Sequence, residues 1–153
     1  MRHETVYVDS SVIGGCEDPE FSQFSLALWD RFIMGECTLV LSELTLTELG
    51  KAPDAVRARL REVPAGNQIV LDVTDEAKEL ADAYLKHGVL GPGSRPDALH
   101  VAIATVGKVD VVASWNFKHI VNLGKIRLFN SVNLELGYGL IEIRTPQEVL
   151  RYE

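Results

Sequence analysis

Three acidic residues and one amide, far apart in the chain, have the types and positions expected of a site that handles phosphate through a cation. Asp9 directly follows a short apolar run, Glu48 lies on a segment after the second apolar run, and Asp97 opens a third apolar segment. Asn116 stands two residues past the run 110–114. Carboxylates repel one another unless a proton or cation lies between them, and oxygen ligands suit Mg²⁺ or Mn²⁺. Such a cation keeps water that can attack phosphorus, so these residues indicate phosphodiester hydrolysis.

Each of these residues also has a simpler interpretation. Asp9 is followed by two serines and can cap a helix or stabilise a turn. Asp97 is the kind of acid that the helix dipole favours in a first turn. Glu48 can be an ordinary exposed residue, and Glu43, five residues earlier, competes with it for a place in the site. Asn116 can be only the residue that turns a strand into a helix, so the spacing alone does not decide between these interpretations.

The elements that must position these residues alternate between strand and helix. Apolar runs predict strands at residues 5–8, 38–42, 110–114, 126–130 and 140–145, with either a strand or an extended connection at 68–73. The spacing of apolar residues predicts helices over residues 20–34, 43–52, 54–63, 75–85 and 97–106, with Asp75 near an N-cap and a short helix near 117–123. Because the strands are continuous apolar runs, they predict a mainly parallel sheet with helices on both faces.

In such a sheet, ligands bind beyond the carboxyl ends of the strands. Asp9, Asp97 and Asn116 fall at that edge, and Glu48 can point back toward it. The helix that Asp97 opens is apolar nearly all round, which is typical of a helix packed between neighbours. His100, one turn further on, can orient Asp97, although packing inside a helix interface explains a histidine there better.

Composition limits the class of protein. With 153 residues, of which 46% are hydrophobic and 24% charged, the chain predicts one globular domain spanning residues 1–153. The net charge of −7 argues against a protein that holds nucleic acid through a broad basic surface, but clustered carboxylates contribute to that sum, so a nuclease is not excluded. Cys16 and Cys37 are too few for a disulfide framework and lack the spacing of a zinc site.

The sequence predicts no membrane segment. Its first residues, "MRHETVYVDSS", contain no apolar stretch of the kind that a signal peptide needs, and no later apolar run approaches the roughly 18 residues of a membrane helix. We therefore expect a cytoplasmic protein.

Four stretches, taken in order, resemble the PIN-domain family, the metal-dependent ribonucleases that include the VapC toxins of bacterial toxin-antitoxin pairs. "VYVDSSVI" is similar to the opening strand and first acid of the family, which falls on Asp9. In "LVLSELTLTELG" the second acid corresponds to Glu48 and not to Glu43. "RPDALHVAIATVGKVDVVASWN" is similar to the last two stretches, with the third acid on Asp97 and the last polar position on Asn116.

This resemblance implies a three-layer α/β/α fold around a central, mainly parallel sheet. It also implies an acidic cavity that holds one or two Mg²⁺ or Mn²⁺ ions, endonucleolytic cleavage of RNA, a homodimer, and, for the toxin branch, a small antitoxin that wraps the enzyme. The sequence departs from the family at Asn116, where many members have aspartate, and at Ser114, which stands in the place of a threonine. An amide ligates a metal without adding charge, so we expect weaker binding of any second ion.

The expected mechanism gives each residue a role. Asp9 and Asp97 hold the principal metal, directly or through water, and Glu48 binds it or activates a water. Asn116 and Ser114 complete the site by hydrogen bonding to water or to the substrate phosphate. Lys118 and His119 follow the strand 110–114 and are candidates for binding the RNA backbone, although a solvated surface explains them equally well.

Two other classes of function compete with a nuclease. A PIN-like module with little catalytic activity, which binds RNA or a protein partner, is favoured by the neutral Asn116 and by the acidic composition. A phosphatase of the haloacid-dehalogenase type needs a second aspartate two residues after the first, where this chain has Ser11. Trp115 can stack on a base, although packing is the simpler role for it.

Overall fold

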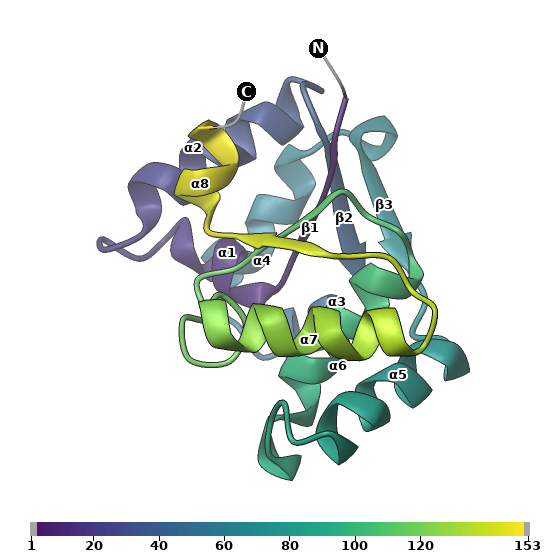
Figure 1. Cartoon of the computed structure of the whole chain (residues 1–153). Coiled ribbons are helices and arrows are strands. Elements are labelled where there is room, and N and C mark those ends of the chain that lie inside the picture. The colour runs from purple at the N-terminus through teal and green to yellow at the C-terminus, as the bar shows by residue number, and fades with distance from the viewer. Residues whose placement is uncertain (1–2, 152–153) are drawn as a thin grey trace.

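Short runs of aliphatic and β-branched residues form the sheet at the centre of the molecule. The computed structural model describes residues 3–151, and within them five parallel strands lie in the order β3-β2-β1-β4-β5 (Figure 1). The strands are β1 (Thr5–Val8), β2 (Thr38–Ser42), β3 (Gln68–Leu71), β4 (Val111–Ala113) and β5 (Glu142–Arg144). β1 is the middle strand, and its Tyr7 pairs with Val40 of β2 and Val112 of β4. The first acid therefore leaves the sheet at its centre.

Helices cover both faces of this sheet. In the described residues the α-helices are α1 (Ser10–Gly15), α2 (Ser22–Ile33), α3 (Glu43–Leu49), α4 (Asp54–Ala58), α5 (Asp75–Lys86), α6 (Arg95–Val106), α7 (Leu123–Glu135) and α8 (Pro146–Arg151). Single turns of 3-10 helix lie at Arg59–Glu62, Ala65–Asn67 and Pro92–Ser94. None of the helices within residues 3–151 is long and apolar enough to cross a membrane.

Alternate residues of each strand enter two separate hydrophobic cores. Tyr7, Val40 and Val112 pack with α5, α6 and α7 on one face, whereas Val6 and Leu39 pack with α1 and α2 on the other. This division follows from the period of two along a strand, which sends neighbouring side chains to opposite faces. The predicted three-layer α/β/α arrangement with a parallel sheet is confirmed.

The helix that carries the third acid is the most buried of the α-helices in the described chain. Residues 98–105 of α6 are all buried, as the apolar sequence predicted. The helix begins at Arg95, two residues before Asp97, because Pro96 fits the first turn, where its missing N–H costs no hydrogen bond. Asp97 therefore lies in the first turn of α6.

The strand predicted at 126–130 and the short helix predicted near 117–123 are wrong. Residues 117–120 form a turn, and α7 runs through the predicted strand. The Asn122 side chain caps this helix by accepting from the Lys125 backbone N–H at 3.2 Å. Phe129 and Val132 are buried three residues apart, which is helical spacing. The run "IRLFN" is apolar enough for a strand, but the cap before it and the apolar residues after it select a helix.

Three further segments are defined by the structure. The N-cap of α5 is Thr74, whose hydroxyl accepts from the Ala77 backbone N–H at 3.1 Å, and Asp75 is the first helical residue. The segment after β5 forms α8. The segment 68–73, for which a strand and a connection were both open, contains β3.

The interface of α5, α6 and α7 contains a buried polar cluster whose loss should be measurable. The Tyr84 hydroxyl donates to Asn133 Oδ1 at 2.5 Å, and both side chains are fully buried. Tyr84→Phe leaves that amide oxygen without its partner, so we expect the free energy of unfolding to fall by about 1–3 kcal/mol. Tyr138→Phe is the matched control, because the Tyr138 hydroxyl donates to the exposed Glu76. Urea denaturation measures both, and equal losses would contradict the account.

Candidate active site

Asp9 is buried at the carboxyl end of the central strand and is held by two serines. Its side chain is the N-cap of α1, and Oδ1 accepts from the Ser11 backbone N–H at 3.1 Å and from the Ser11 hydroxyl at 2.5 Å. Oδ2 accepts from the Ser114 hydroxyl at 2.7 Å. Only 5% of the residue is exposed. The capping role is therefore real, and it fixes the carboxylate at the edge of the sheet where ligands bind.

The environment of Asp9 disfavours its charged form. Burial raises the pKa of Asp9. The electrostatic attraction of His100 and the hydrogen bonds from Ser11 and Ser114 offset only part of this rise. The nearby carboxylate of Glu48 raises the pKa of Asp9 further. The two carboxylates therefore repel each other, a repulsion that a bound cation would relieve.

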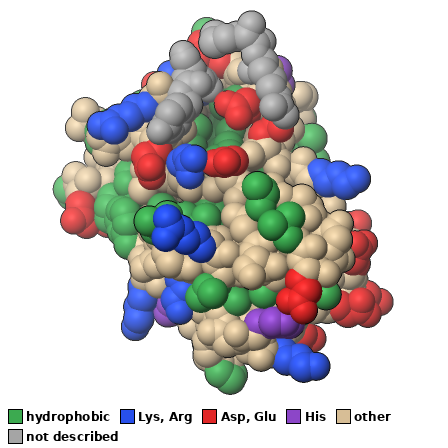
Figure 2. All heavy atoms as spheres, in the orientation of Figure 1, with side chains coloured by type: hydrophobic (Ala, Val, Ile, Leu, Met, Phe, Trp, Pro, Cys, Tyr) green, Lys and Arg blue, Asp and Glu red, His purple; other side chains and the backbone are tan. Residues whose placement is uncertain are grey.

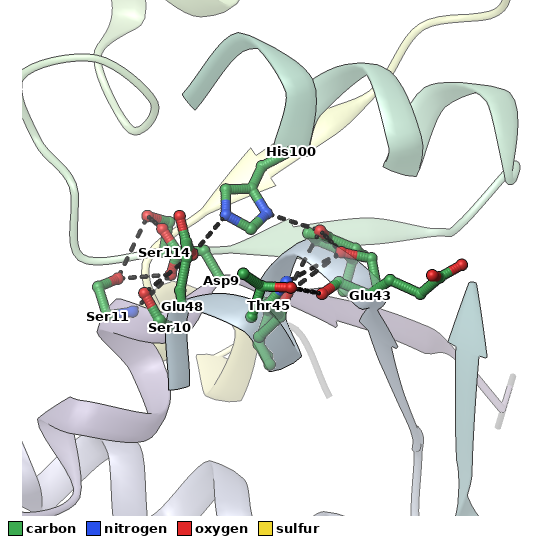
Figure 3. Close-up of polar contacts among 12 residues, drawn as sticks. Asp9, Ser10, Ser11, Glu43, Thr45, Glu48, His100 and Ser114 are labelled. Carbon is green, nitrogen blue, oxygen red and sulfur yellow. Dashed lines mark hydrogen bonds and ion pairs between the residues drawn. The ribbon is translucent and has the colours of Figure 1, made fainter. Parts of the chain in front are cut away.

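Glu48 is held from α6 by a chain of hydrogen bonds. Its Oε1 lies 2.8 Å from His100 Nε2, and His100 Nδ1 lies 2.6 Å from the Tyr7 hydroxyl (Figure 3). His100 Nε2 can donate to the Glu48 carboxylate, and the Tyr7 hydroxyl can either donate to His100 Nδ1 or accept from it, so the imidazole bridges the two residues. The Tyr7 oxygen lies 2.8 Å from Ser42 Oγ, which continues the chain into the core. His100 is 1% exposed, so it is a packed helix residue whose partner is Glu48 and not Asp97.

Glu48, and not Glu43, is the acid of α3 that belongs to the site. Glu43 is exposed and extends away from the cluster in Figure 3. Glu48 accepts from the Ser10 hydroxyl at 3.1 Å as well as facing His100. Partial burial by itself raises the pKa of Glu48, but the hydrogen bond and charge of His100 and the bond from Ser10 outweigh it, so the pKa of Glu48 is lowered. Glu48 is thus an ionised carboxylate beside Asp9.

Asp97 has its own histidine partner. Its Oδ2 lies 2.8 Å from His119 Nδ1, and about a quarter of each side chain is exposed. His119 Nε2 lies 3.5 Å from the Ser94 hydroxyl, at the limit of a hydrogen bond. The structure therefore places His119, predicted as a substrate-binding residue, directly on the third acid of the predicted site.

Asn116 lies in the turn that follows β4. Its Oδ1 accepts from the His119 backbone N–H at 3.0 Å, and its backbone oxygen accepts from Ile120 and Val121. Its own N–H donates to Ser114 Oγ at 3.0 Å, the same hydroxyl that holds Asp9. Asn116 closes the turn after β4 and thereby positions His119. Lys118 lies on this turn and is exposed.

The donor chemistry fits a hard divalent cation, although the three acids do not form one cluster. Within residues 3–151, no group of three or more His, Cys, Asp or Glu side chains is arranged to hold a metal ion. Asp9 and Glu48 provide two adjacent carboxylates, and Mg²⁺ typically uses one or two carboxylates and retains water. Asp97 is engaged by His119.

Sequence reasoning missed the residues that orient the acids. Tyr7 and His100 are separated by 93 residues, and nothing in the spacing joins them. Ser10 and Ser11 do carry a signal, because they follow Asp9 directly, but the separate use of Ser10 by Glu48 depends on how α1 and α3 pack.

Comparison with known proteins identifies the fold. No protein-family model matches the sequence, and no curated protein is significantly similar to it. Among solved structures, VapC20 of Mycobacterium tuberculosis, a sarcin-ricin loop cleaving toxin, is similar with a TM-score of 0.58 and 16% identity over 74% of this chain and 92% of that chain. VapBC2 from Rickettsia felis, bound to a DNA fragment from its promoter, has a TM-score of 0.58 and 11% identity over 92% and 98% of the two chains. FitAcB from Neisseria gonorrhoeae has a TM-score of 0.58 and 17% identity over 93% and 98%.

These similarities show that the chain has the PIN-domain fold of the VapC-type proteins, as the resemblance in the sequence predicted.

The opposite pKa shifts of the two carboxylates predict opposite effects on stability. The raised pKa of Asp9 means that its contribution to stability is present at acidic pH and is lost as the pH rises through the folded-state pKa. Asp9→Asn should therefore raise the free energy of unfolding at neutral pH in the presence of a chelator. The lowered pKa of Glu48 means that its contribution is present at neutral pH and is lost on acidification. Glu48→Gln should therefore be destabilising at neutral pH.

Denaturant unfolding at neutral pH and at a pH below the ordinary carboxyl range measures both differences. The difference in free energy of unfolding between each variant and the original protein should shrink at the lower pH, where both carboxylates are protonated. Shifts of the same sign for Asp9→Asn and Glu48→Gln at neutral pH, or differences that stay equally large at the lower pH, would contradict this electrostatic description.

Proposed function

We propose that the protein is a metal-dependent endoribonuclease that hydrolyses RNA phosphodiester bonds and acts as the toxin of a toxin-antitoxin pair. The observation that carries the proposal is the pair formed by Asp9 and Glu48, two oriented carboxylates at the carboxyl edge of a PIN-domain sheet. The similarity to VapC20, described as a sarcin-ricin loop cleaving toxin, also supports an RNA-cleaving toxin.

In this proposal, Asp9 and Glu48 hold Mg²⁺ or Mn²⁺, with Asp97 contributing directly or through water. The cation, when bound, lowers the pKa of water and offsets the negative charge that develops on the phosphate. Ser11 and Ser114 keep the Asp9 carboxylate in one orientation, so no reorganisation is needed when the substrate arrives.

The remaining roles follow from protonation and exposure. Glu48 is ionised because of its lowered pKa, and we assign to it the acceptance of a proton from the attacking water. His100 holds that carboxylate in place. The exposed Lys118 binds an RNA phosphate, and His119 keeps Asp97 oriented toward the substrate.

One observation favours the alternative, a PIN-like module that binds RNA or a protein partner with little catalysis. Asp97 and Asn116 are both occupied by His119, Asp97 through the imidazole and Asn116 through the backbone N–H. A protein that needs these contacts for stability would not release Asp97 to a cation. Binding without cleavage in the assay below would establish this alternative.

The proposal also includes partners. VapBC2 is a two-component assembly bound to promoter DNA, and FitAB has likewise been solved on a DNA fragment. By analogy we propose a small antitoxin for this chain, and a homodimer as its own assembly.

A matched pair of acids on α3 tests the catalytic assignment. RNA cleavage should require Mg²⁺ or Mn²⁺ and stop with a chelator. Glu48→Gln should lower the cleavage rate by about 100-fold or more, because the proton acceptor is lost, whereas Glu43→Gln, an exposed acid on the same helix, should leave it unchanged. Asp9→Asn and Asp97→Asn should also abolish cleavage. If the purified protein cuts no RNA, or if these variants cut it as fast as the original, the enzyme assignment fails.

A further inference from the structure

Three aromatic side chains lie together beside the candidate active site. Phe21 immediately precedes α2, and Trp115 and Phe117 follow β4. The rings of Phe21 and Trp115 are stacked, with centroids 4.5 Å apart and planes inclined by 23°. The Phe117 ring lies 6.2 Å from Trp115 and 6.4 Å from Phe21. Figure 2, drawn in the orientation of Figure 1, shows hydrophobic side chains gathered on the left of the molecule, close to the position of α1 in Figure 1.

Trp115 is the fixed member of this group. Its Nε1 donates to Ser25 Oγ at 2.8 Å, and Ser25 donates in turn to the Val12 carbonyl. Gly15 permits this contact, because a Cβ at that position would lie 2.9 Å from the indole nitrogen and 2.5 Å from Ser25 Oγ. Trp115 is 9% exposed, whereas Phe117 is 51% exposed. The indole therefore forms a rigid wall, and Phe117 presents an open ring beside it.

A cavity of about 480 Å³, open to solvent, is lined by two of these rings, while Phe117 lies beside Trp115 and outside the lining. Its lining consists of Phe21 and Trp115 with Ser11, Gly14, Gly15, Asp18 and Asn116. Ser11 connects the cavity to the candidate active site, because its hydroxyl donates to Asp9 and accepts from the Trp115 backbone N–H at 3.0 Å. The cavity therefore borders the candidate active site.

The chemistry of the lining selects a flat, uncharged group. Aromatic faces and glycine backbone accommodate a planar ring, and base-aromatic stacking is the usual means of holding unpaired nucleotides. The exposed Asp18 carboxylate repels phosphate but accepts hydrogen bonds from the amino groups of a base. With a net charge of −7, the chain has little general attraction for RNA, so a stacking contact would carry much of the affinity.

We propose that this cavity and the exposed Phe117 ring beside Trp115 together form a base subsite, which holds an unpaired nucleobase of single-stranded RNA against the wall formed by Trp115 and Phe21. The subsite rests on the proposed RNA substrate but does not require that the protein cleaves it. Phe117 is a binding residue in this arrangement and takes no part in the chemistry.

The test measures binding of a short fluorescein-labelled single-stranded RNA in the presence of a chelator, so that no cleavage is needed. Phe117→Ala should weaken binding by roughly 5-fold to 100-fold, Phe117→Leu by a similar factor, and Phe117→Trp should preserve it. Leu134→Ala, which removes an exposed side chain of α7 that belongs neither to the aromatic group nor to the cavity lining, is the control. A change in tryptophan fluorescence on RNA binding should come from Trp115, which lines the cavity, because Trp29 lies outside the lining and is only 1% exposed.

An RNA of the same length with an abasic position, moved along the strand in successive oligonucleotides, completes the test. At one position the missing base should weaken binding to the original protein but not to Phe117→Ala. If Phe117→Ala binds RNA as the original does, or if the original binds no RNA, the subsite is wrong. In particular, unchanged RNA binding combined with loss of a protein partner would make the cavity a protein-docking surface.

The same variants separate this proposal from the enzymatic one. Binding that depends on Phe117 without any cleavage in Mn²⁺ would support the subsite and overturn the nuclease assignment. Cleavage that is insensitive to Phe117→Ala would overturn the subsite and leave the nuclease assignment intact. Unfolding curves of the Phe117 variants should match the original, because half of that side chain is exposed.

Discussion

The structure depends on the burial of one carboxylate, Asp9, at the end of the central strand. Burying a charge is costly unless it is hydrogen-bonded and compensated, and here three donors from Ser11 and Ser114 supply only the first of these conditions. Glu48 adds a second negative charge nearby, and its own partner is His100. Two mutually repelling carboxylates thus lie at the edge of the parallel sheet where ligands bind. Perturbed carboxylates of this kind are common at functional sites.

The same constraint explains why polar residues penetrate the core around the site. Ser42, Tyr7 and His100 form a hydrogen-bonded line from β2 through β1 to α6, and all three are buried. Such a line is stable only when each member is satisfied, and no described buried side-chain nitrogen or oxygen lacks a partner. Glu48 is therefore held by a rigid part of the molecule, although the carboxylate itself reaches solvent.

The strands that position the site could be predicted from the sequence because buried parallel strands have a strong local signal. "TVYV" and "TLVLS" have no other good interpretation, and the acids follow them at fixed distances. The region after β4 could not be predicted in the same way. Whether "IRLFN" becomes a strand or a helix depends on the Asn122 cap and on packing against α5. For Asn116 the sequence left a site residue and a turn residue both open, and the structure shows it in a turn. The pairing of His100 with Glu48 and of His119 with Asp97 depends on tertiary contacts across 52 and 22 residues, which no local pattern encodes.

The central claim is that Asp9 and Glu48 share a divalent cation, and electron paramagnetic resonance of Mn²⁺ tests it most directly. Titration of the purified protein without RNA should convert the signal of free Mn²⁺ to that of bound Mn²⁺. Asp9→Asn should weaken this binding by about tenfold or more, since one charged ligand is worth at least about 1.4 kcal/mol in such a site. Absence of binding in the original protein, or equal binding by Asp9→Asn, would contradict the account.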